Sequence, residues 1–475
     1  MTATPKRRSD PDDRELRLWK VGRTLLLAFT AAVLVAGSIF TVLVVLLDFR
    51  ALDTGTKLDA KTLFDLVKLS FGVVAGAGAL VALVVAYRRQ RVDEAGAHRE
   101  STRLHTERFS AAVEMLGSDS PAVRLGGIHA LSGLADDAPR PELRQTCIDV
   151  LCAYLRLPYP PDPGTLPDLQ PDNTPHTEEQ REAHQAKQDR FRELREVRHT
   201  ILRLIGDHYR LPAEDDRRSW QGYNLDLTGV TIDGPMDFTG AQFSGGTVNF
   251  TRVQVSGGTM NFTGVQVSGG TMNFNRAQVS GSTVNFAGAT FSGGAMDFTG
   301  AQFSGGIVDL AGARFSGGTV AFTSAQISST VDFTGARFSG GTVDFTAARF
   351  SGGTVHFNAA GFSGGTVHFH NARFSDGTVH FTAARFSGGT VHFNNAQFSS
   401  GIVNFYGVRI SGGIMDFTDA QFSDGTVNFH NARFSDGNMN FRNALGSVPH
   451  GLLDSLGLPV PATVTLPDHW QPGAP

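Results

Sequence analysis

Residues 343–354 read VDFTAARFSGGT, and this twelve-residue unit repeats with small changes from Phe238 to Phe441. Apolar and polar residues alternate on either side of each Phe, which is the two-residue period of a β-strand. The glycines come after each second strand, where they permit the positive φ angles of tight corners. One unit is too short to enclose a core, so consecutive units must bury their apolar sides against one another. The repeat therefore predicts a β-solenoid.

Each unit consists of two five-residue pieces and a two-residue Gly-Thr spacer. A coil of twelve residues would be too narrow to hold two large aromatic side chains at native packing density. We therefore expect two units per coil and four sides. Eighteen repeat centres, one of them Leu310 in place of Phe, then make about nine coils and a rod of about 40 Å. The unit that contains Ile327 is one residue short, and we expect an irregular corner there.

The five-residue pieces resemble the pentapeptide-repeat family, whose consensus is A-(D/N)-(L/F)-(S/T)-x. The stretches that match it include Val331–Gly335 and Ala336–Gly340. The resemblance covers about residues 223–445 and implies a right-handed, four-sided β-solenoid. The regular Gly-Thr spacer departs from the family pattern and is expected to lengthen alternate sides of the coil.

The N-terminal part of the chain has a different composition. Residues 24–47 are apolar apart from small hydroxyl side chains, and residues 69–87 are rich in Gly, Ala and Val. The first segment is long enough to cross a bilayer as a helix, and the second is a shorter candidate. A secretory signal peptide is disfavoured, because the first apolar run is too long and no small-residue cleavage site follows it. We expect a transmembrane hairpin.

The flanking charges predict how this hairpin is oriented. Seven basic residues precede the first segment, and Arg88, Arg89 and Arg91 follow the second. In the loop between them, four basic residues are balanced by four Asp. Basic flanks stay in the cytoplasm, so both termini are expected there. The expected location is the inner (plasma) membrane of a bacterial cell, because the helical residues that follow are similar to the linker of bacterial membrane-anchored pentapeptide-repeat proteins.

Short helices are predicted between the hairpin and the repeat. Pro121 and Pro141 stand where two of them would begin, and a longer charged helix is expected from Thr177 to Tyr209. This helix is expected to cap the first coil, because an open β-edge invites aggregation. The chain is thereby divided into a basic N-terminus (1–23), the hairpin (24–87), a helical module (88–157), a Pro-rich linker (158–176), a capping helix (177–218), the solenoid (219–445) and a C-terminal cap or tail (446–475).

Residues that could carry catalysis are few. Cys147 and Cys152 are five positions apart, which suits buried, inert thiols better than a metal site in a reducing compartment. The recurrent Gly-Gly pairs are corners, since a phosphate-binding loop would be a single Gly-rich turn before a helix. The sequence therefore predicts a protein that is not an enzyme and that needs no cofactor.

The position before the central Phe holds Asn, Asp or His in nearly every unit. Four consecutive units carry His there, and in a two-unit coil these residues form two columns with neighbours about 4.8 Å apart. Stacked imidazoles could bind a transition metal or titrate near neutral pH. The alternative is that this position is exposed and tolerates changes of residue among the copied repeats. His370 and His430 lie outside the column and support this alternative. The metal candidates are His356, His368, His380 and His392.

Arg recurs beside the second Phe of several units, at the position that holds Gln in other units, as at Arg337, Arg349, Arg373 and Arg385. Stacked Arg could bind nucleic acid, but the Asp and Arg of the solenoid nearly balance, and phosphate binding needs a clear cationic excess. Some members of the resembled family mimic DNA with an acidic rod and shield DNA gyrase. In this sequence the Arg of the solenoid offset the negative charge of the Asp, so the rod lacks the dense negative charge that DNA mimicry needs.

These observations favour a non-enzymatic, membrane-anchored scaffold that presents a β-solenoid to a cytoplasmic protein partner. One alternative is a gyrase-binding DNA mimic held at the membrane, and a second is a metal or pH sensor that uses the His columns. Binding to nucleic acid is not expected. The sequence leaves the partner and the oligomeric state open, with a homo-oligomer among the options.

Overall fold

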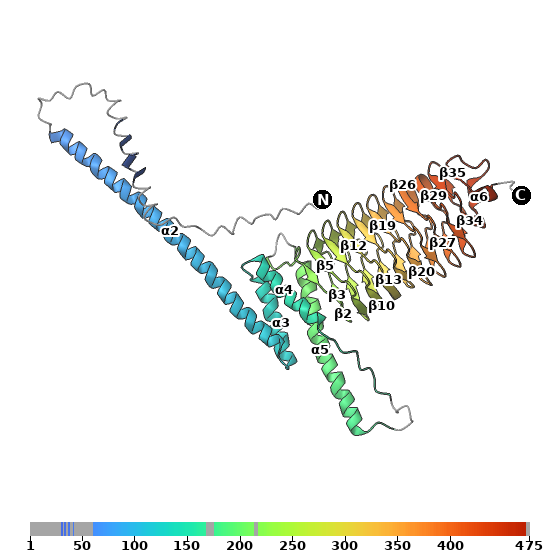
Figure 1. Cartoon of the computed structure of the whole chain (residues 1–475), viewed down its shortest axis with the longest axis horizontal. Helices are drawn as coiled ribbons and strands as arrows, with labels where there is room; N and C mark the ends of the chain where they lie inside the picture. The colour runs from blue at the N-terminus through green and yellow to red at the C-terminus, as the bar shows by residue number, and fades with distance from the viewer. Residues whose placement is uncertain are drawn as a thin grey trace, which may run out of the picture. The chain divides into compact units, whose positions relative to one another are not determined.

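A computed structural model describes residues 60–167, 175–212 and 217–471, together with isolated positions between 30 and 41. The chain forms two compact units, Met1–Leu104 and His105–Pro475. The second unit contains the shorter helices and the whole of the repeat (Figure 1).

Helix α2 spans Ala60–Leu116 without a break and contains the second predicted membrane segment, Leu69–Tyr87. The first predicted segment, Thr24–Leu47, lies largely outside the described residues. In the part of the chain that the structure describes, no helix combines the length and apolar character that a membrane crossing requires. The structure thus gives no support to the predicted hairpin, which stays a prediction from sequence.

Helices α3 (Pro121–Asp136), α4 (Pro141–Arg156) and α5 (Glu178–Arg210) follow. Pro stands in the first turn of α3 and α4, where no intrahelical N–H is required. A capping box begins α5: the Thr177 hydroxyl accepts from the Gln180 N–H, and the Gln180 side chain accepts from the Thr177 N–H. The capping helix was expected to reach residue 218, but it ends at Arg210 because Pro212 disfavours helical geometry at the residue before it.

The solenoid has four sides, which we number 1 to 4 in chain order around each coil. Side 1 contains β1 (Leu225–Asp226), β5 (Thr247–Asn249), β9 (Thr271–Asn273), β12 (Ala295–Asp297), β15 (Thr319–Ala321), β19 (Thr342–Asp344), β23 (Thr366–His368), β33 (Asn438–Asn440) and β35 (Val464–Thr465). Side 2 contains β2 (Thr231–Ile232), β6 (Gln254–Ser256), β16 (Gln326–Ile327), β20 (Arg349–Phe350), β24 (Arg373–Phe374), β27 (Gln397–Phe398), β30 (Gln421–Phe422) and β34 (Leu445–Gly446).

Sides 3 and 4 complete each coil. Side 3 contains β3 (Met236–Asp237), β7 (Thr259–Asn261), β17 (Thr330–Asp332), β21 (Thr354–His356), β25 (Thr378–His380), β28 (Ile402–Asn404) and β31 (Thr426–Asn428). Side 4 contains β4 (Gln242–Phe243), β8 (Gln266–Val267), β11 (Thr290–Phe291), β14 (Arg314–Phe315), β18 (Arg337–Phe338), β22 (Gly361–Phe362) and β32 (Arg433–Phe434). Four longer strands run through a corner: β10 (Gln278–Asn285) and β13 (Gln302–Asp309) join sides 2 and 3, and β26 (Arg385–His392) and β29 (Arg409–Asp416) join sides 4 and 1.

The strands pair in parallel, and their register fixes the size of the coil. Gln278 pairs with Gln254 on one side and with Gln302 on the other, a spacing of two units. The prediction of two units per coil is thereby confirmed, and the repeat forms about ten turns. The short unit removes one residue from its corner, and its strands nevertheless stay in register, as Gln326 with Arg349 and Thr330 with Thr354 show.

The interior of the rod is filled by stacked aromatic rings. Phe250 lies parallel to Phe274 of the next coil at 4.6 Å between ring centroids, and edge-on to Phe262 across the coil at 6.2 Å. The same two contacts recur along the rod, and these rings are buried. Such offset and edge-to-face pairs suit the charge distribution of the ring. The outward residues of each strand are thereby held on a rigid support.

Both ends of the rod are covered. At the first coil, Tyr209 of α5 packs edge-on against Phe238 at 5.6 Å and donates a hydrogen bond to the Tyr223 carbonyl at 2.9 Å. The last coil is covered by residues that follow the repeat, among them the short helices α6 (Leu452–Leu456) and η2 (Asp468–Trp470). Trp470 packs against Phe441 at 5.4 Å and donates to the Gly446 carbonyl at 2.8 Å. These contacts shield strand edges that would otherwise present unpaired backbone groups.

Candidate functional site

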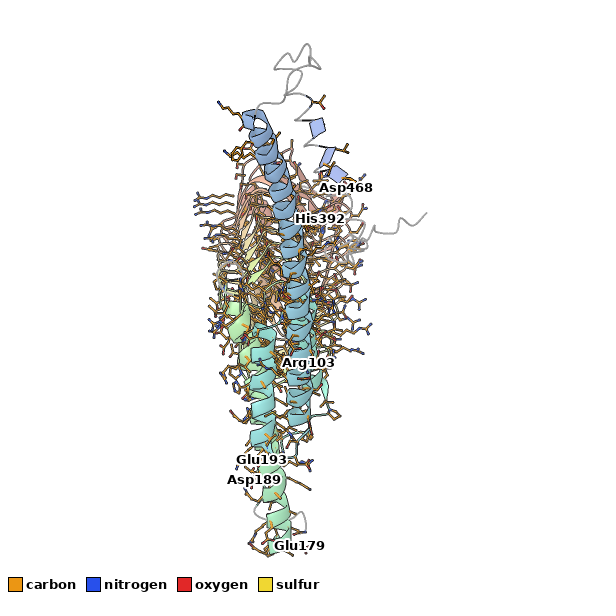
Figure 2. The ribbon with its side chains drawn as sticks, turned by 90° about the vertical axis from the view of Figure 1, so that its left-hand side faces the viewer. Arg103, Glu179, Asp189, Glu193, His392 and Asp468 are labelled. Atoms are coloured by element: carbon orange, nitrogen blue, oxygen red, sulfur yellow. The ribbon has the colours of Figure 1, made fainter. Side chains whose placement is uncertain are left out.

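The outward side chains of the solenoid form columns, and each column has one residue per coil. Figure 2 shows the side chains on the ribbon, with His392 of the solenoid labelled. Asp, Asn and His occupy the column before the central Phe on sides 1 and 3. Gln and Arg occupy most positions of the column on sides 2 and 4. In these columns the Asp lie on sides 1 and 3 and the Arg lie on sides 2 and 4.

The Asp and Asn column has a structural role. In each case the side-chain oxygen accepts a hydrogen bond from the N–H two residues later, as Asp297 Oδ1 accepts from the Thr299 N–H at 2.8 Å. This local bond closes the corner that follows each of these strands. The residues that make it are Asp226, Asp237, Asn249, Asn261, Asn273, Asn285, Asp297, Asp309, Asp332, Asp344, Asn404, Asp416, Asn428 and Asn440. The recurrent D-F-T and N-F-T triplets were the sequence signal for it.

The four predicted His fall into two stacked pairs on opposite sides of the rod. His356 and His380 lie on side 3 with ring centroids 5.3 Å apart, and His368 and His392 lie on side 1 at 5.0 Å. A ring nitrogen binds a metal in the plane of its imidazole, and the rings of each pair are nearly parallel, at 7° and 6°, so either pair would have to leave its stack to chelate one Zn²⁺. Among the described residues, no group of three or more His, Cys, Asp or Glu is placed to hold a metal ion.

Burial and stacking lower the pKa of one imidazole in each pair. Burial, followed by the neighbouring imidazole of His392, lowers the pKa of His368 below its ordinary value, although the carboxylate of Asp344 acts in the opposite sense. Burial and the neighbouring His356 lower the pKa of His380 in the same way. Both effects favour the neutral imidazole in the folded protein.

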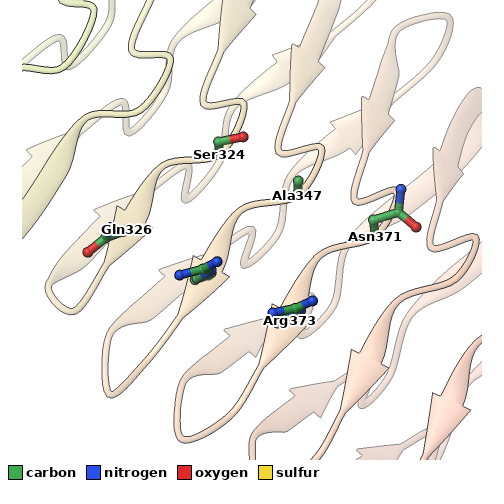
Figure 3. Close-up of a pocket in the computed structure, with 6 residues that line it drawn as sticks. Ser324, Gln326, Ala347, Asn371 and Arg373 are labelled. Atoms are coloured by element: carbon green, nitrogen blue, oxygen red, sulfur yellow. The ribbon is translucent and has the colours of Figure 1, made fainter.

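The four Arg that the sequence singled out do not form one column. Arg337 and Arg385 lie on side 4, and Arg349 and Arg373 lie on side 2. The side 2 pair lines a shallow groove of ≈ 300 Å³ with Gln326 on the preceding strand. In Figure 3 these side chains come from successive parallel strands, and Ser324, Ala347 and Asn371 occupy the adjacent corner.

Both cysteines are buried and unbridged. Burial raises the pKa of the Cys147 thiol to about 11 and that of Cys152 to about 12, so both stay protonated and poorly nucleophilic at neutral pH. Cys147 Sγ lies 4.0 Å from His105 Nε2, but burial lowers the pKa of this imidazole, which favours a neutral pair.

The junction between the helices and the first coil holds a polar cluster that sequence reasoning missed. Asp233 accepts hydrogen bonds from Tyr159 at 2.9 Å and from Arg195 and His199 at 3.1 Å. Burial alone would raise the pKa of Asp233, but these bonds and the nearby positive charges lower it to about 2. Arg198 covers the Tyr159 ring at 4.3 Å. These residues come from distant parts of the chain, and no local pattern could have linked them.

Arg198 also ties the helices to the rod. Its guanidinium is buried and donates to the Leu155 carbonyl at the end of α4 and to the Thr231 carbonyl of β2, at 2.7 and 3.0 Å. Both acceptors are backbone atoms, so the arginine fixes the position of α4 relative to side 2 of the first coil. Its role is positioning rather than chemistry.

His208 forms a second buried contact at the junction. Its ring stacks on Trp220 at 4.2 Å, and its Nε2 lies 3.2 Å from the Asp136 carboxylate. Its Nδ1 lies 2.6 Å from the Leu204 carbonyl, which can only accept, so this nitrogen donates. Burial alone would lower the pKa of His208, but the bonds to Asp136 and Leu204 raise it above its ordinary value.

Comparison with protein families agrees with this architecture. Residues 274–325 match the family model for pentapeptide repeats (nine copies). No curated protein matches the chain, and no solved structure matches it. The matched residues lie within the solenoid and include strands of all four sides.

Proposed function

Because this chain is a pentapeptide-repeat protein, we propose that it is a non-enzymatic, membrane-anchored scaffold whose solenoid binds another protein. Pentapeptide-repeat solenoids are generally non-enzymatic. The observation that carries the proposal is the combination of a fully packed aromatic interior with regular outward columns. Such a rod offers a long, rigid and repetitive surface, which suits recognition of a partner.

The polar residues that are not part of the repeat support this proposal. The bonds around Asp233 and Arg198 join helices to the first coil, and the bond of His208 joins α5 to Asp136 at the end of α3. The grooves on side 2 are shallow, and the Asp and Asn of sides 1 and 3 close corners. The unlike polar groups that converge on Asp233 are bonded to one another in joining the helices to the first coil, which suits a positioning role better than catalysis.

Membrane anchoring is the second part of the proposal, and the sequence of residues 24–87 supports it. The expected location is the inner membrane of a bacterial cell, with both termini in the cytoplasm. Substituted-cysteine labelling tests it well, because the two native cysteines are buried. We expect Thr54→Cys to react with an impermeant maleimide on intact cells and Thr2→Cys to react only after lysis. Extraction of the chain by carbonate in the absence of detergent would contradict the anchor.

The alternatives have less support. A DNA mimic needs dense negative charge along the rod, but the Asp of sides 1 and 3 are interrupted by Asn and His and are engaged in corner bonds. A metal sensor needs a ligand set, and the His pairs provide at most two imidazoles each.

Affinity capture from a mild-detergent extract tests the scaffold. The full chain and residues 105–475 serve as parallel baits, because a bait that starts at Ser219 would remove α5 from the first coil. We expect both baits to retain the same proteins. Retention by the full chain alone would place binding in residues 1–104 and would contradict a role for the solenoid. Capture dominated by DNA gyrase would favour the DNA mimic.

A further inference from the structure

Side 4 carries a column of arginines that we call the arginine ladder. Along this side the outward position is neutral in the first three coils, at Gln242, Gln266 and Thr290. From there to the end of the rod it is basic except for one glycine. In order, the column reads Arg314, Arg337, Gly361, Arg385, Arg409 and Arg433.

The arginine ladder is exposed and its charges are not neutralised. All five arginines are exposed on their strands. Among the described residues, none of their guanidinium groups makes a hydrogen bond or ion pair, whereas Arg195 and Arg210 at the junction do. The other outward residue of this side is a Ser whose hydroxyl is occupied, as Ser339 Oγ donates to the Phe315 carbonyl. The ladder is therefore a row of charges with no counter-charge in the described part of this chain.

The spacing of the arginine ladder follows from the rings beneath it. Phe315, Phe338 and Phe362 are the inward neighbours of three consecutive ladder positions, and their centroids are 4.8 and 4.7 Å apart. An α-helix that lies along the rod would place one carboxylate per turn, about every 5.4 Å. An extended strand would place them about 6.8 Å apart, which matches less well. The pitch of the ladder therefore favours a helix.

Charge arguments disfavour nucleic acid and side 1 of a second copy as partners. Residues 221–450 contain ten Arg, twelve Asp and no Lys or Glu, so the rod as a whole has no cationic excess to attract a polyanion such as nucleic acid. The ladder is also only one arginine wide. Side 1 of a second copy is a poor match as well, because its Asp do not form a continuous row: two His separate Asp344 from Asp416.

We propose that the arginine ladder is the docking surface for an acidic α-helix of a partner protein, which lies along the rod with one carboxylate facing each coil. The proposal rests on the scaffold function and names the chemistry of its partner. Tyr406 is 45% exposed at the corner before Arg409 and provides an apolar contact beside the ladder. Arginine suits this role because its fork binds carboxylates with two hydrogen bonds.

Fluorescence anisotropy with the full chain in detergent tests the proposal. The probe is a synthetic helical peptide with one Glu per turn on a single face, and the control peptide has the same composition with the Glu distributed around the helix. The ladder variant is Arg337→Gln/Arg385→Gln. Its matched control is Arg349→Gln/Arg373→Gln, which removes the same charge from side 2. Gln is the native residue at Gln242 and Gln266, so both variants keep a side chain that the rod accommodates.

We expect the ladder variant to weaken binding of the one-face peptide roughly fivefold or more, and the side 2 variant to leave it unchanged within about twofold. Gly361→Arg should tighten binding, because a Cβ there meets open space and the new arginine fills the gap in the ladder. Equal losses in both double variants, or equal binding of the two peptides, would overturn the proposal.

Two further probes test whether the arginine ladder binds nucleic acid or a lipid surface instead of an acidic helix. Tighter, ladder-dependent binding of single-stranded DNA or of phosphatidylserine vesicles would overturn the proposal in favour of those partners. The capture experiment distinguishes a failure of the arginine-ladder proposal from a failure of the scaffold proposal. If the ladder variant retains the same proteins as the native chain, the solenoid is still a scaffold, but it binds through another side.

Discussion

The junction and the repeat stabilise the protein in different ways. At the junction, each polar residue has its own partners, and the contacts are not repeated along the rod: Arg198 joins α4 to the first coil, and His208 joins α5 to Asp136. In the repeat, each residue has copies one coil away, and the same ring contact recurs from Phe238 to Phe441. The comparison shows that unique polar contacts position the rod, whereas repeated apolar contacts hold it together.

The largest expected effect is in the repeat. Phe357 stacks on Phe333 and Phe381, each at 4.8 Å. Phe357→Ala leaves a cavity in the middle of the rod and should reduce the free energy of unfolding by about 3–5 kcal/mol. Because each coil contacts only its neighbours, we also expect calorimetry to resolve two transitions. Phe357→Leu is the control, since Leu310 already occupies the equivalent position. A single unshifted transition in the Ala variant would contradict the nearest-neighbour view.

The second effect concerns the junction and depends on pH. The pKa of His208 is raised in the folded state, so its contribution is fully present below the unfolded pKa of about 6.5 and is lost as pH rises through the folded pKa. His208→Gln should reduce stability by about 1.5–3 kcal/mol at low pH and by less at high pH. Urea titrations at several pH values measure this. A constant difference across the series would show that His208 acts through packing on Trp220 alone.

The third prediction tests how closely α5 approaches the rod. A Cβ added at Gly206 would lie 2.5 Å from the Asp237 carbonyl oxygen, which is backbone and cannot move aside cheaply. Gly206→Ala should therefore cost about 1–3 kcal/mol despite the better helix propensity of Ala. Gly133→Ala, where the added Cβ meets open space, should stabilise the protein instead. Hydrogen exchange should increase in the first coil of the Gly206 variant and not in the middle of the rod.

The smallest effect returns to the repeat, where the pH dependence has the opposite sign. The pKa values of His368 and His380 are lowered, so stability is present above the unfolded pKa of about 6.5 and is lost as pH falls through the folded pKa values. His368→Asn/His380→Asn should abolish that loss and add a corner bond at each site, for a gain of about 0.5–1.5 kcal/mol. Thermal melts between about pH 5 and about pH 8 measure it. An unchanged profile would mean that the titration of the two imidazoles is not linked to folding.

The sequence predicted what depends on repetition. The spacing of Phe338 and Phe350 was enough to predict the strands, the solenoid and the two-unit coil, because a period is a local property that copies reinforce. The pairing of His356 with His380 followed from the same period. The junction could not be predicted, because Tyr159, Arg198 and Asp233 meet only after α4 and α5 pack on the first coil. The division of the Arg between sides 2 and 4 also required the coil size to be known.

The coil of two units constrains how such a gene can change. A duplication or loss of one twelve-residue unit would rotate all later residues by half a coil, so that a column continuing from Arg314 and Arg337 would pass from side 4 to side 2. The rod would still fold, since both sides accept Arg or Gln. The column of outward residues would then lie on one side before the inserted or lost unit and on the opposite side after it. Recombination between the repeated DNA segments can therefore preserve the binding face only when it adds or removes units in pairs.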